Sequence, residues 1–87
     1  MNTLDIEKRF ADIVGPVAED NGLRLVKTEY VKEDGNRYLR AYVEKPEGEV
    51  SINDCTMISR IVSKKLDKED FIDEAYTMEI CSPGFLE

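Results

Sequence analysis

The fold of this chain is decided by residues 24–44, which read RLVKTEYVKEDGNRYLRAYVE. Apolar and polar side chains alternate on both sides of the central EDGN, and such alternation is typical of a β-strand with one buried face. Asp34 and Gly35 are residue types that accept positive φ, which favours a tight turn. The stretch therefore predicts a β-hairpin. Its core-facing side chains are expected to be Val26, Thr28, Tyr30, Leu39, Ala41 and Val43.

The segment before this hairpin has the apolar spacing of one helical face. The residues that form this face are Ile6, Phe10, Ile13, Val14 and Val17. Thr3 is the expected N-cap, and Asn21-Gly22 is a suitable end because glycine accepts the left-handed conformation that closes a helix. Pro16 removes one backbone donor, so we expect a bend near Asp12.

A second helix is expected after the hairpin, beginning at Ser51 with Asp54 in a capping box. Its apolar face would consist of Cys55, Ile58, Val62 and Leu66, and Lys64, Lys65 and Lys68 would lie near its negative end. An acidic run follows, which we expect to be a solvated loop: Asp67, Glu69, Asp70, Asp73 and Glu74. The alternation of Tyr76, Met78 and Ile80 with polar residues then predicts a third strand.

The predicted order is helix, strand, strand, helix, strand, with no repeat and no internal linker. Each helix has one apolar face and each strand has one apolar side, so the economical arrangement is a two-layer α+β fold. Two helices would cover one face of a three-stranded sheet, and the other face would be left to solvent or a partner. The shared core is predicted to include Phe10, Val14, Val26, Leu39, Val43, Ile58, Val62, Met78 and Ile80.

Charge limits the classes of partner. Twelve basic and nineteen acidic side chains give the 87 residues a net charge of −7. This balance disfavours binding to nucleic acid by general phosphate neutralisation, but it leaves room for a local basic patch or for a basic partner protein. No apolar run approaches the roughly 20 residues of a membrane span, and the acidic N-terminal residues are unlike a secretory signal. We expect a cytoplasmic protein without a membrane partner.

The residues that carry chemistry are few. There is no histidine, so neither Cys55 nor Cys81 has the usual base that activates a nucleophile. Cys55 is expected on the buried helical face as a small apolar side chain. Neither a Cys-x-x-Cys pair nor a ligand histidine is present for a metal. A KH-type RNA-binding domain would need a Gly-x-x-Gly clamp, which is missing. We predict no enzyme activity, no metal, no cofactor and no small-molecule substrate.

The most suggestive surface feature is the outward side of the second strand, where Tyr38, Arg40 and Tyr42 alternate with the core residues. Lys27 is expected on the same face. Aromatic side chains beside an arginine on an open sheet can stack on bases or anchor a protein partner. The same pattern is also that of ordinary cross-strand packing, because tyrosine is a good strand former. Both interpretations stay open, with packing the commoner case.

Several segments together resemble the N-terminal domain of the RimP-type ribosome maturation factors. Residues 25–30 (LVKTEY), 39–46 (LRAYVEKP), 51–55 (SINDC), 59–60 (SR) and 76–84 (YTMEICSPG) each resemble a family segment, in the same order along the chain. The last of these contains the family motif Ser82, Pro83 and Gly84. The resemblance covers nearly the whole chain, which makes it more specific than any single motif.

The resemblance implies a non-enzymatic assembly factor domain that binds the immature small ribosomal subunit, through a ribosomal protein, its RNA, or both. It also implies that residues 1–85 form the N-terminal domain and that the family's small barrel-like second domain is absent from this chain. Leu86 and Glu87 are typical of a vector-derived tail before a purification tag. The alternatives are a stand-alone RNA-binding α+β domain and a protein-interaction module unrelated to ribosomes.

Overall fold

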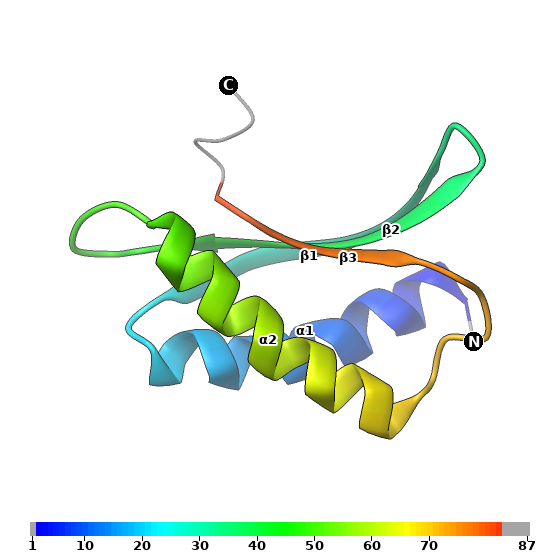
Figure 1. The fold of residues 1–87 in the computed structure, drawn as a ribbon, viewed down its shortest axis with the longest axis horizontal. Helices are drawn as coiled ribbons and strands as arrows, with labels where there is room; N and C mark the ends of the chain where they lie inside the picture. The colour runs from blue at the N-terminus through cyan, green and yellow to red at the C-terminus, as the bar shows by residue number, and fades with distance from the viewer. Residues whose placement is uncertain (1, 83–87) are drawn as a thin grey trace.

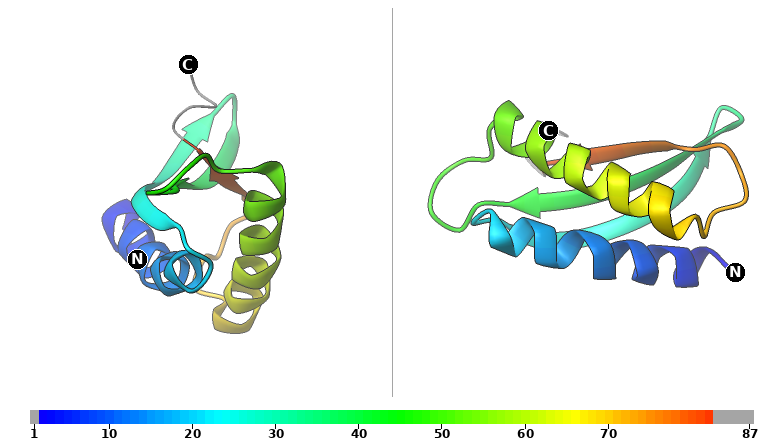
Figure 2. Two further views of the ribbon diagram at one scale, coloured as in Figure 1. Left: turned by 90° about the vertical axis from the view of Figure 1, so that its left-hand side faces the viewer. Right: turned by 60° about the horizontal axis from the view of Figure 1, so that its bottom comes forward.

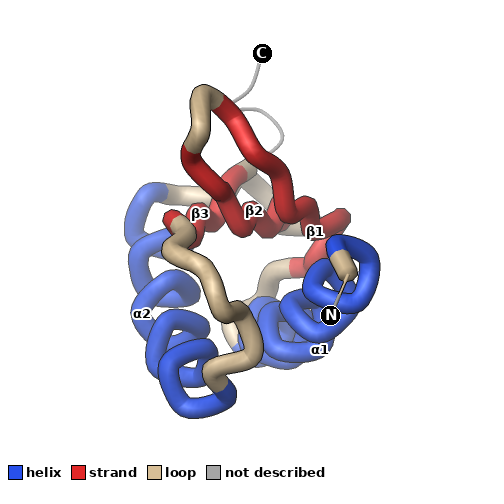
Figure 3. Tube along the Cα trace, turned by 90° about the vertical axis from the view of Figure 1, so that its right-hand side faces the viewer, coloured by secondary structure: helices blue, strands red, loops and turns tan. Residues whose placement is uncertain are grey.

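A computed structural model describes residues 2–82 and contains the elements in the predicted order. They are α1 (Thr3–Asp20), β1 (Arg24–Glu33), β2 (Asn36–Glu44), α2 (Ile52–Glu69) and β3 (Thr77–Cys81). Both helices lie on the same side of the three-stranded sheet, as Figures 1 and 3 show. The predicted two-layer α+β fold is therefore confirmed.

The hairpin forms as predicted. β1 and β2 pair antiparallel, and Glu33 faces Asn36 across a two-residue turn. Asp34 and Gly35 have φ of 52° and 81°. Positive φ at both positions is the geometry that matches the right-handed twist of the flanking strands. The turn therefore fixes the register of the whole pair.

A bulge in β1 overturns one prediction for the core. Leu25 pairs with Val43 and Lys27 pairs with Tyr42, so Val26 is the extra residue between them. Val26 is 49% exposed, and Leu25 packs against the core in its place. The prediction that Val26 is buried was wrong because a bulge shifts the alternation of faces by one residue.

The third strand completes the sheet on the far side of β2. β3 pairs parallel to β2, which gives the strand order β1-β2-β3. Parallel neighbours need a crossover, and α2 provides it (Figure 2). β3 begins at Thr77, one residue later than the alternation predicts. Met78 and Ile80 are partly buried against the core.

The helix ends are capped by side chains. Asn2, rather than the predicted Thr3, caps α1, because its Oδ1 accepts from the Asp5 amide at 2.8 Å while Thr3 is already helical. The capping box of α2 is confirmed, with Ser51 and Asp54 exchanging hydrogen bonds of 3.1 and 3.0 Å. At the other end of α1, Gly22 has the expected positive φ of 77°.

The core lies between the helices and the inner face of the sheet. Its largest fully buried side chains are Phe10, Val14, Leu39, Val43, Ile58 and Val62, all of which were predicted. Cys55 departs from its prediction, since it is half-buried at the start of α2 rather than within the buried face. Pro16 lies inside α1, which continues to Asp20.

The acidic run is not a simple solvated loop. α2 extends through Asp67 to Glu69, and Glu69 accepts a hydrogen bond of 3.0 Å from Arg9 on α1. In the following loop, Glu74 accepts one of 3.1 Å from the Tyr30 hydroxyl and also pairs with Arg37. Glu74 thereby connects the loop before β3 to β1 and β2, while Glu69 connects α2 to α1.

α1 contacts the free edge of β1 through Glu7. The Glu7 carboxylate accepts a hydrogen bond of 2.8 Å from the Tyr30 amide, and the Glu7 carbonyl accepts one of 2.9 Å from the Thr28 hydroxyl. An exposed strand edge would otherwise offer unpaired amides to another chain.

Neither of the two helices in residues 2–82 combines the length and apolarity that a membrane span needs.

Candidate partner-binding face of the sheet

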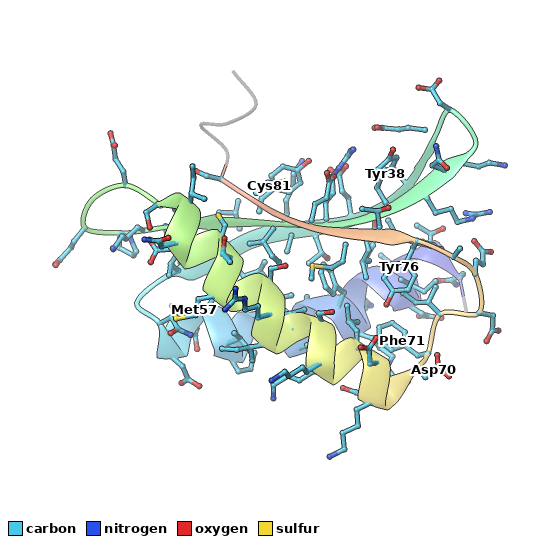
Figure 4. All side chains as sticks on the ribbon, in the orientation of Figure 1. Tyr38, Met57, Asp70, Phe71, Tyr76 and Cys81 are labelled. Carbon is cyan, nitrogen blue, oxygen red and sulfur yellow. The ribbon has the colours of Figure 1, made fainter. Side chains whose placement is uncertain are left out.

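The side of the sheet turned away from the helices is the candidate site, and we call it the outer face. Neither helix of residues 2–82 lies above the strands on this side in Figure 1, and Figure 4 places Tyr38 on this side and Tyr76 on the helical side. The register sets three rows of residues across the three strands on this face. They are Val31, Tyr38 and Thr77; Glu29, Arg40 and Glu79; and Lys27, Tyr42 and Cys81. The structure therefore brings the four predicted residues to one face: Lys27, Tyr38, Arg40 and Tyr42.

Arg40 is the centre of this face. Its Nε donates to Glu79 at 2.6 Å, and its two terminal nitrogens donate to the two oxygens of Glu33 at 3.0 Å each. A longer contact of 3.4 Å reaches Glu29. Paired charged hydrogen bonds of this kind are stronger than neutral ones and fix the orientation of the guanidinium. All three guanidinium nitrogens thus already have partners within the domain.

These contacts change the acid–base properties of both partners. The hydrogen bonds that Arg40 donates to Glu33, and then the one to Glu79, raise the pKa of Arg40 above its usual value. The same hydrogen bond lowers the pKa of the exposed Glu33 carboxyl. Arg40 is only 19% exposed and permanently charged. It is therefore a fixed element of the face rather than a mobile cation.

The tyrosines differ in their accessibility. The Arg40 guanidinium lies 4.7 Å from the centroid of the Tyr38 ring, which leaves Tyr38 half-buried. Tyr42 is only 5% exposed, and the Lys27 ammonium lies 4.9 Å from its ring centroid. Burial and then the nearby Glu29 carboxylate raise the pKa of Tyr42. The accessible parts of this face are therefore Lys27, the edge of Tyr38 and the carboxylates.

The sign of the face follows from its charged members. Two cations, Lys27 and Arg40, lie among the carboxylates of Glu29, Glu33 and Glu79. The face therefore carries a net charge of about −1 around a neutralised arginine. Such a surface favours a cationic partner over a phosphate, because complementary potentials steer association.

The three carboxylates were missed by sequence reasoning, although one signal was available. A two-residue turn at Asp34-Gly35 places Glu29 opposite Arg40 by counting outward from the turn. Glu79 had no such signal, because the register of the parallel strand depends on the crossover.

The cysteines, a metal site and the Ser82-Pro83-Gly84 motif have weaker support as functional sites than the outer face. Cys81 lies at the end of β3, and burial chiefly raises the pKa of its thiol and of the Cys55 thiol. Within residues 2–82, no group of three acidic or thiol side chains is arranged to hold a metal. Ser82 directly follows β3 and is half-buried, whereas Pro83 and Gly84, together with Leu86 and Glu87, lie outside the described residues.

Comparison with known families agrees with the resemblance drawn from the sequence. The family model of the RimP N-terminal domain matches residues 13–86. The match begins within α1 and includes the whole hairpin, α2 and β3.

Proposed function

Because this chain belongs to the RimP N-terminal domain family of ribosome maturation factors, we propose that it binds the immature small ribosomal subunit and supports its maturation without a catalytic step. The outer face is the proposed contact surface, and a basic segment of a ribosomal protein is the proposed partner. The proposed compartment is the cytoplasm, and the domain needs no cofactor for this role.

The observation that supports this proposal is an acidic sheet face that neither helix of the described residues covers, built around a neutralised arginine. Glu33 and Glu79 are 52% and 41% exposed, so both carboxylates remain accessible to a cationic side chain. Arg40 engages both oxygens of Glu33 but only one oxygen of Glu79. Tyr38 adds a flat, half-buried aromatic surface beside them, and tyrosine is enriched at the centres of protein interfaces. A Lys- or Arg-rich segment could therefore lie across the strands with both charge and stacking contacts.

The absence of a catalytic step is supported by the chemistry of the nucleophiles. The chain contains no histidine. Burial raises the pKa of the Cys55 and Cys81 thiols, which keeps both protonated near neutral pH. A protonated thiol without a neighbouring base is a poor nucleophile.

Co-sedimentation with free small subunits tests the proposal. The 87-residue chain and a two-domain protein of this family would be compared, each with the pair of changes Glu33→Gln and Glu79→Gln. We expect about three- to tenfold weaker binding for this pair, most clearly at low salt, because charges at the rim of an interface act mainly on association. Glu47→Gln with Glu49→Gln is the matched control, since both residues are exposed loop glutamates and the charge change is the same.

Two other results of the co-sedimentation experiment would contradict the proposal. Failure of both proteins to associate with small subunits would favour a protein-interaction module unrelated to ribosomes. Equal loss of binding in the test pair and the control pair would show that only total charge matters, and the outer face would no longer be the contact surface.

A further inference from the structure

The basic side chains of this domain fall into two groups. Eight of the twelve lie outside α2, and six of these eight form ion pairs within the described residues. The other four lie on α2, and none of them forms an ion pair within the same part of the chain: Arg60, Lys64, Lys65 and Lys68. With nineteen carboxylates in the chain, unpaired cations concentrated on one helix are an unusual distribution.

Three of these cations share one line on the helix. Arg60, Lys64 and Lys68 are each four residues apart, so they follow one another at about 6 Å along the axis on nearly the same side. The buried side of α2 is formed by Ile58, Val62 and Leu66, and all three cations are exposed. They therefore form a row on the solvent side, which we call the α2 row.

The helix dipole accounts for the presence of a cation at only one end of this row. The negative end of a helix dipole favours a cation within the last turn, and Lys68 lies there. Arg60 and Lys64 lie outside that turn. The nearest acidic residues are directed elsewhere: Glu69 pairs with Arg9, and Asp67 lines a hollow on the β3 side. Within residues 2–82 the row therefore forms no ion pair, although Asp12 and Glu69 line one hollow together with Lys68.

A shallow hollow continues the row toward the start of α2. It is lined by Asn53, Thr56, Met57, Arg60 and Ile61. Met57 and Ile61 are 39% and 37% exposed, and Met57 points away from the sheet in Figure 4. An unstacked base can stack on the plane of an arginine guanidinium and form hydrogen bonds with neighbouring polar groups. Arg60 and Asn53 provide these two features in the hollow, beside the apolar Met57 and Ile61. An acidic peptide would match the cations but would make no comparable use of this hollow.

We propose that the exposed side of α2 binds a single-stranded RNA segment, with phosphates on Lys64 and Lys68 and one base in the hollow beside Arg60. This surface is separate from the outer face. The inference goes beyond the proposed function by assigning RNA to the helical layer, while the sheet keeps the protein partner. Local cations can bind phosphates on an acidic domain because the interaction is short-range once salt screens the net charge.

Fluorescence anisotropy with a labelled 12-nucleotide oligouridylate, titrated at several salt concentrations, tests the α2 row. For Lys64→Gln with Lys68→Gln, we expect weaker binding and a slope of log Kd against log salt that is smaller by about 1.4, because each lost contact to a single strand removes about 0.7. Lys8→Gln with Lys32→Gln is the control, since both are exposed lysines that form no ion pair with any described residue, and the change in net charge is identical. The control should leave the slope nearly unchanged.

The hollow is tested separately. Met57→Ser should weaken binding without changing the slope. Ile52→Ser, which removes an apolar side chain that lies outside the hollow and is 76% exposed, should not weaken binding. If the two double lysine variants weakened RNA binding and lowered the salt slope equally, total charge alone would explain the binding, and the proposal would be overturned. Absence of RNA binding, combined with loss of subunit co-sedimentation in the α2 pair, would overturn it in favour of a protein contact. Normal co-sedimentation of the parent in either case would leave the proposed function standing.

Discussion

Arg40 on β2 and Glu79 on β3 are joined by a hydrogen bond of 2.6 Å across the parallel half of the sheet. The same guanidinium also bonds to Glu33 on β1 at 3.0 Å, so one side chain links all three strands. The strands that it joins are distant in sequence, because β3 follows β2 only after the whole of α2. The outer face is thus both a candidate binding surface and a brace for the sheet.

Replacing this guanidinium should therefore lower stability as well as change the surface. For Arg40→Gln we expect a loss of about 1.5 to 3 kcal/mol in the free energy of unfolding, the usual range for hydrogen bonds to charged groups. The lost bonds would also leave the carboxylates of Glu29, Glu33 and Glu79 close together. Urea denaturation at neutral pH measures the loss. Lys32→Gln, an exposed cation outside this network, should change the value by less than about 0.5 kcal/mol; a similar effect of both changes would contradict the bracing role.

The capping box of α2 predicts a dependence of stability on pH. Hydrogen bonds from Ser51, chiefly from its backbone amide, lower the pKa of Asp54 below its usual 3.8. A carboxyl with a lower pKa in the folded state stabilises the fold fully above its unfolded pKa and loses that contribution as pH falls through the folded pKa. The stability difference between the wild type and Asp54→Asn should therefore be constant near neutral pH and should shrink below pH 3.8.

Thermal unfolding of both proteins in a pH series checks this expectation. Glu33 also has a lowered pKa, but it is present in both proteins, so its contribution cancels in the difference. A stability difference that grows toward acid pH would mean that the capping interaction is not formed in solution.

Packing predicts a sharp contrast between three apolar positions. Phe10→Ala and Ile58→Ala should each cost about 2 to 5 kcal/mol, because both side chains are fully buried between the layers. Val26→Ala should cost less than about 0.5 kcal/mol, because Val26 lies at the bulge and is 49% exposed. Chemical denaturation of the three variants measures these values, and a large loss for Val26→Ala would place the bulge elsewhere in β1.

Val26 also illustrates what could be predicted from the sequence. Alternation and the Asp34-Gly35 turn determine the hairpin, its register near the turn, and hence the pairing of Glu29 with Arg40. A bulge eight residues from the turn leaves no trace in the alternation, because Leu25 and Val26 are both apolar and either could face the core. The helices were predictable for the same reason as the hairpin, since their apolar spacing and caps are local.

The composition of the outer face was only half predictable. Tyr38, Arg40 and Tyr42 share a side because they alternate with core residues, and this needs no tertiary information. The 5% exposure of Tyr42 depends on how neighbouring side chains pack around it, and the position of Glu79 depends on the parallel register set by α2. Both are tertiary features. The sequence therefore located the face but not the charge that surrounds its arginine.

The last prediction concerns the thiols, on which the proposal of a non-catalytic role partly depends. Burial is the largest cause that raises the pKa of both Cys55 and Cys81 above 9.0, followed by the carboxylates of Asp54 and Glu79, respectively. Because the thiolate is the reactive form, alkylation by iodoacetamide should be slow near neutral pH. Its rate should rise with a midpoint above pH 9.0 in each single-cysteine variant, Cys55→Ser and Cys81→Ser. The urea-unfolded chain is the control and should react at the pH of an ordinary thiol. A midpoint near neutral pH in the folded protein would identify an activated thiolate and would reopen the case for a nucleophilic role.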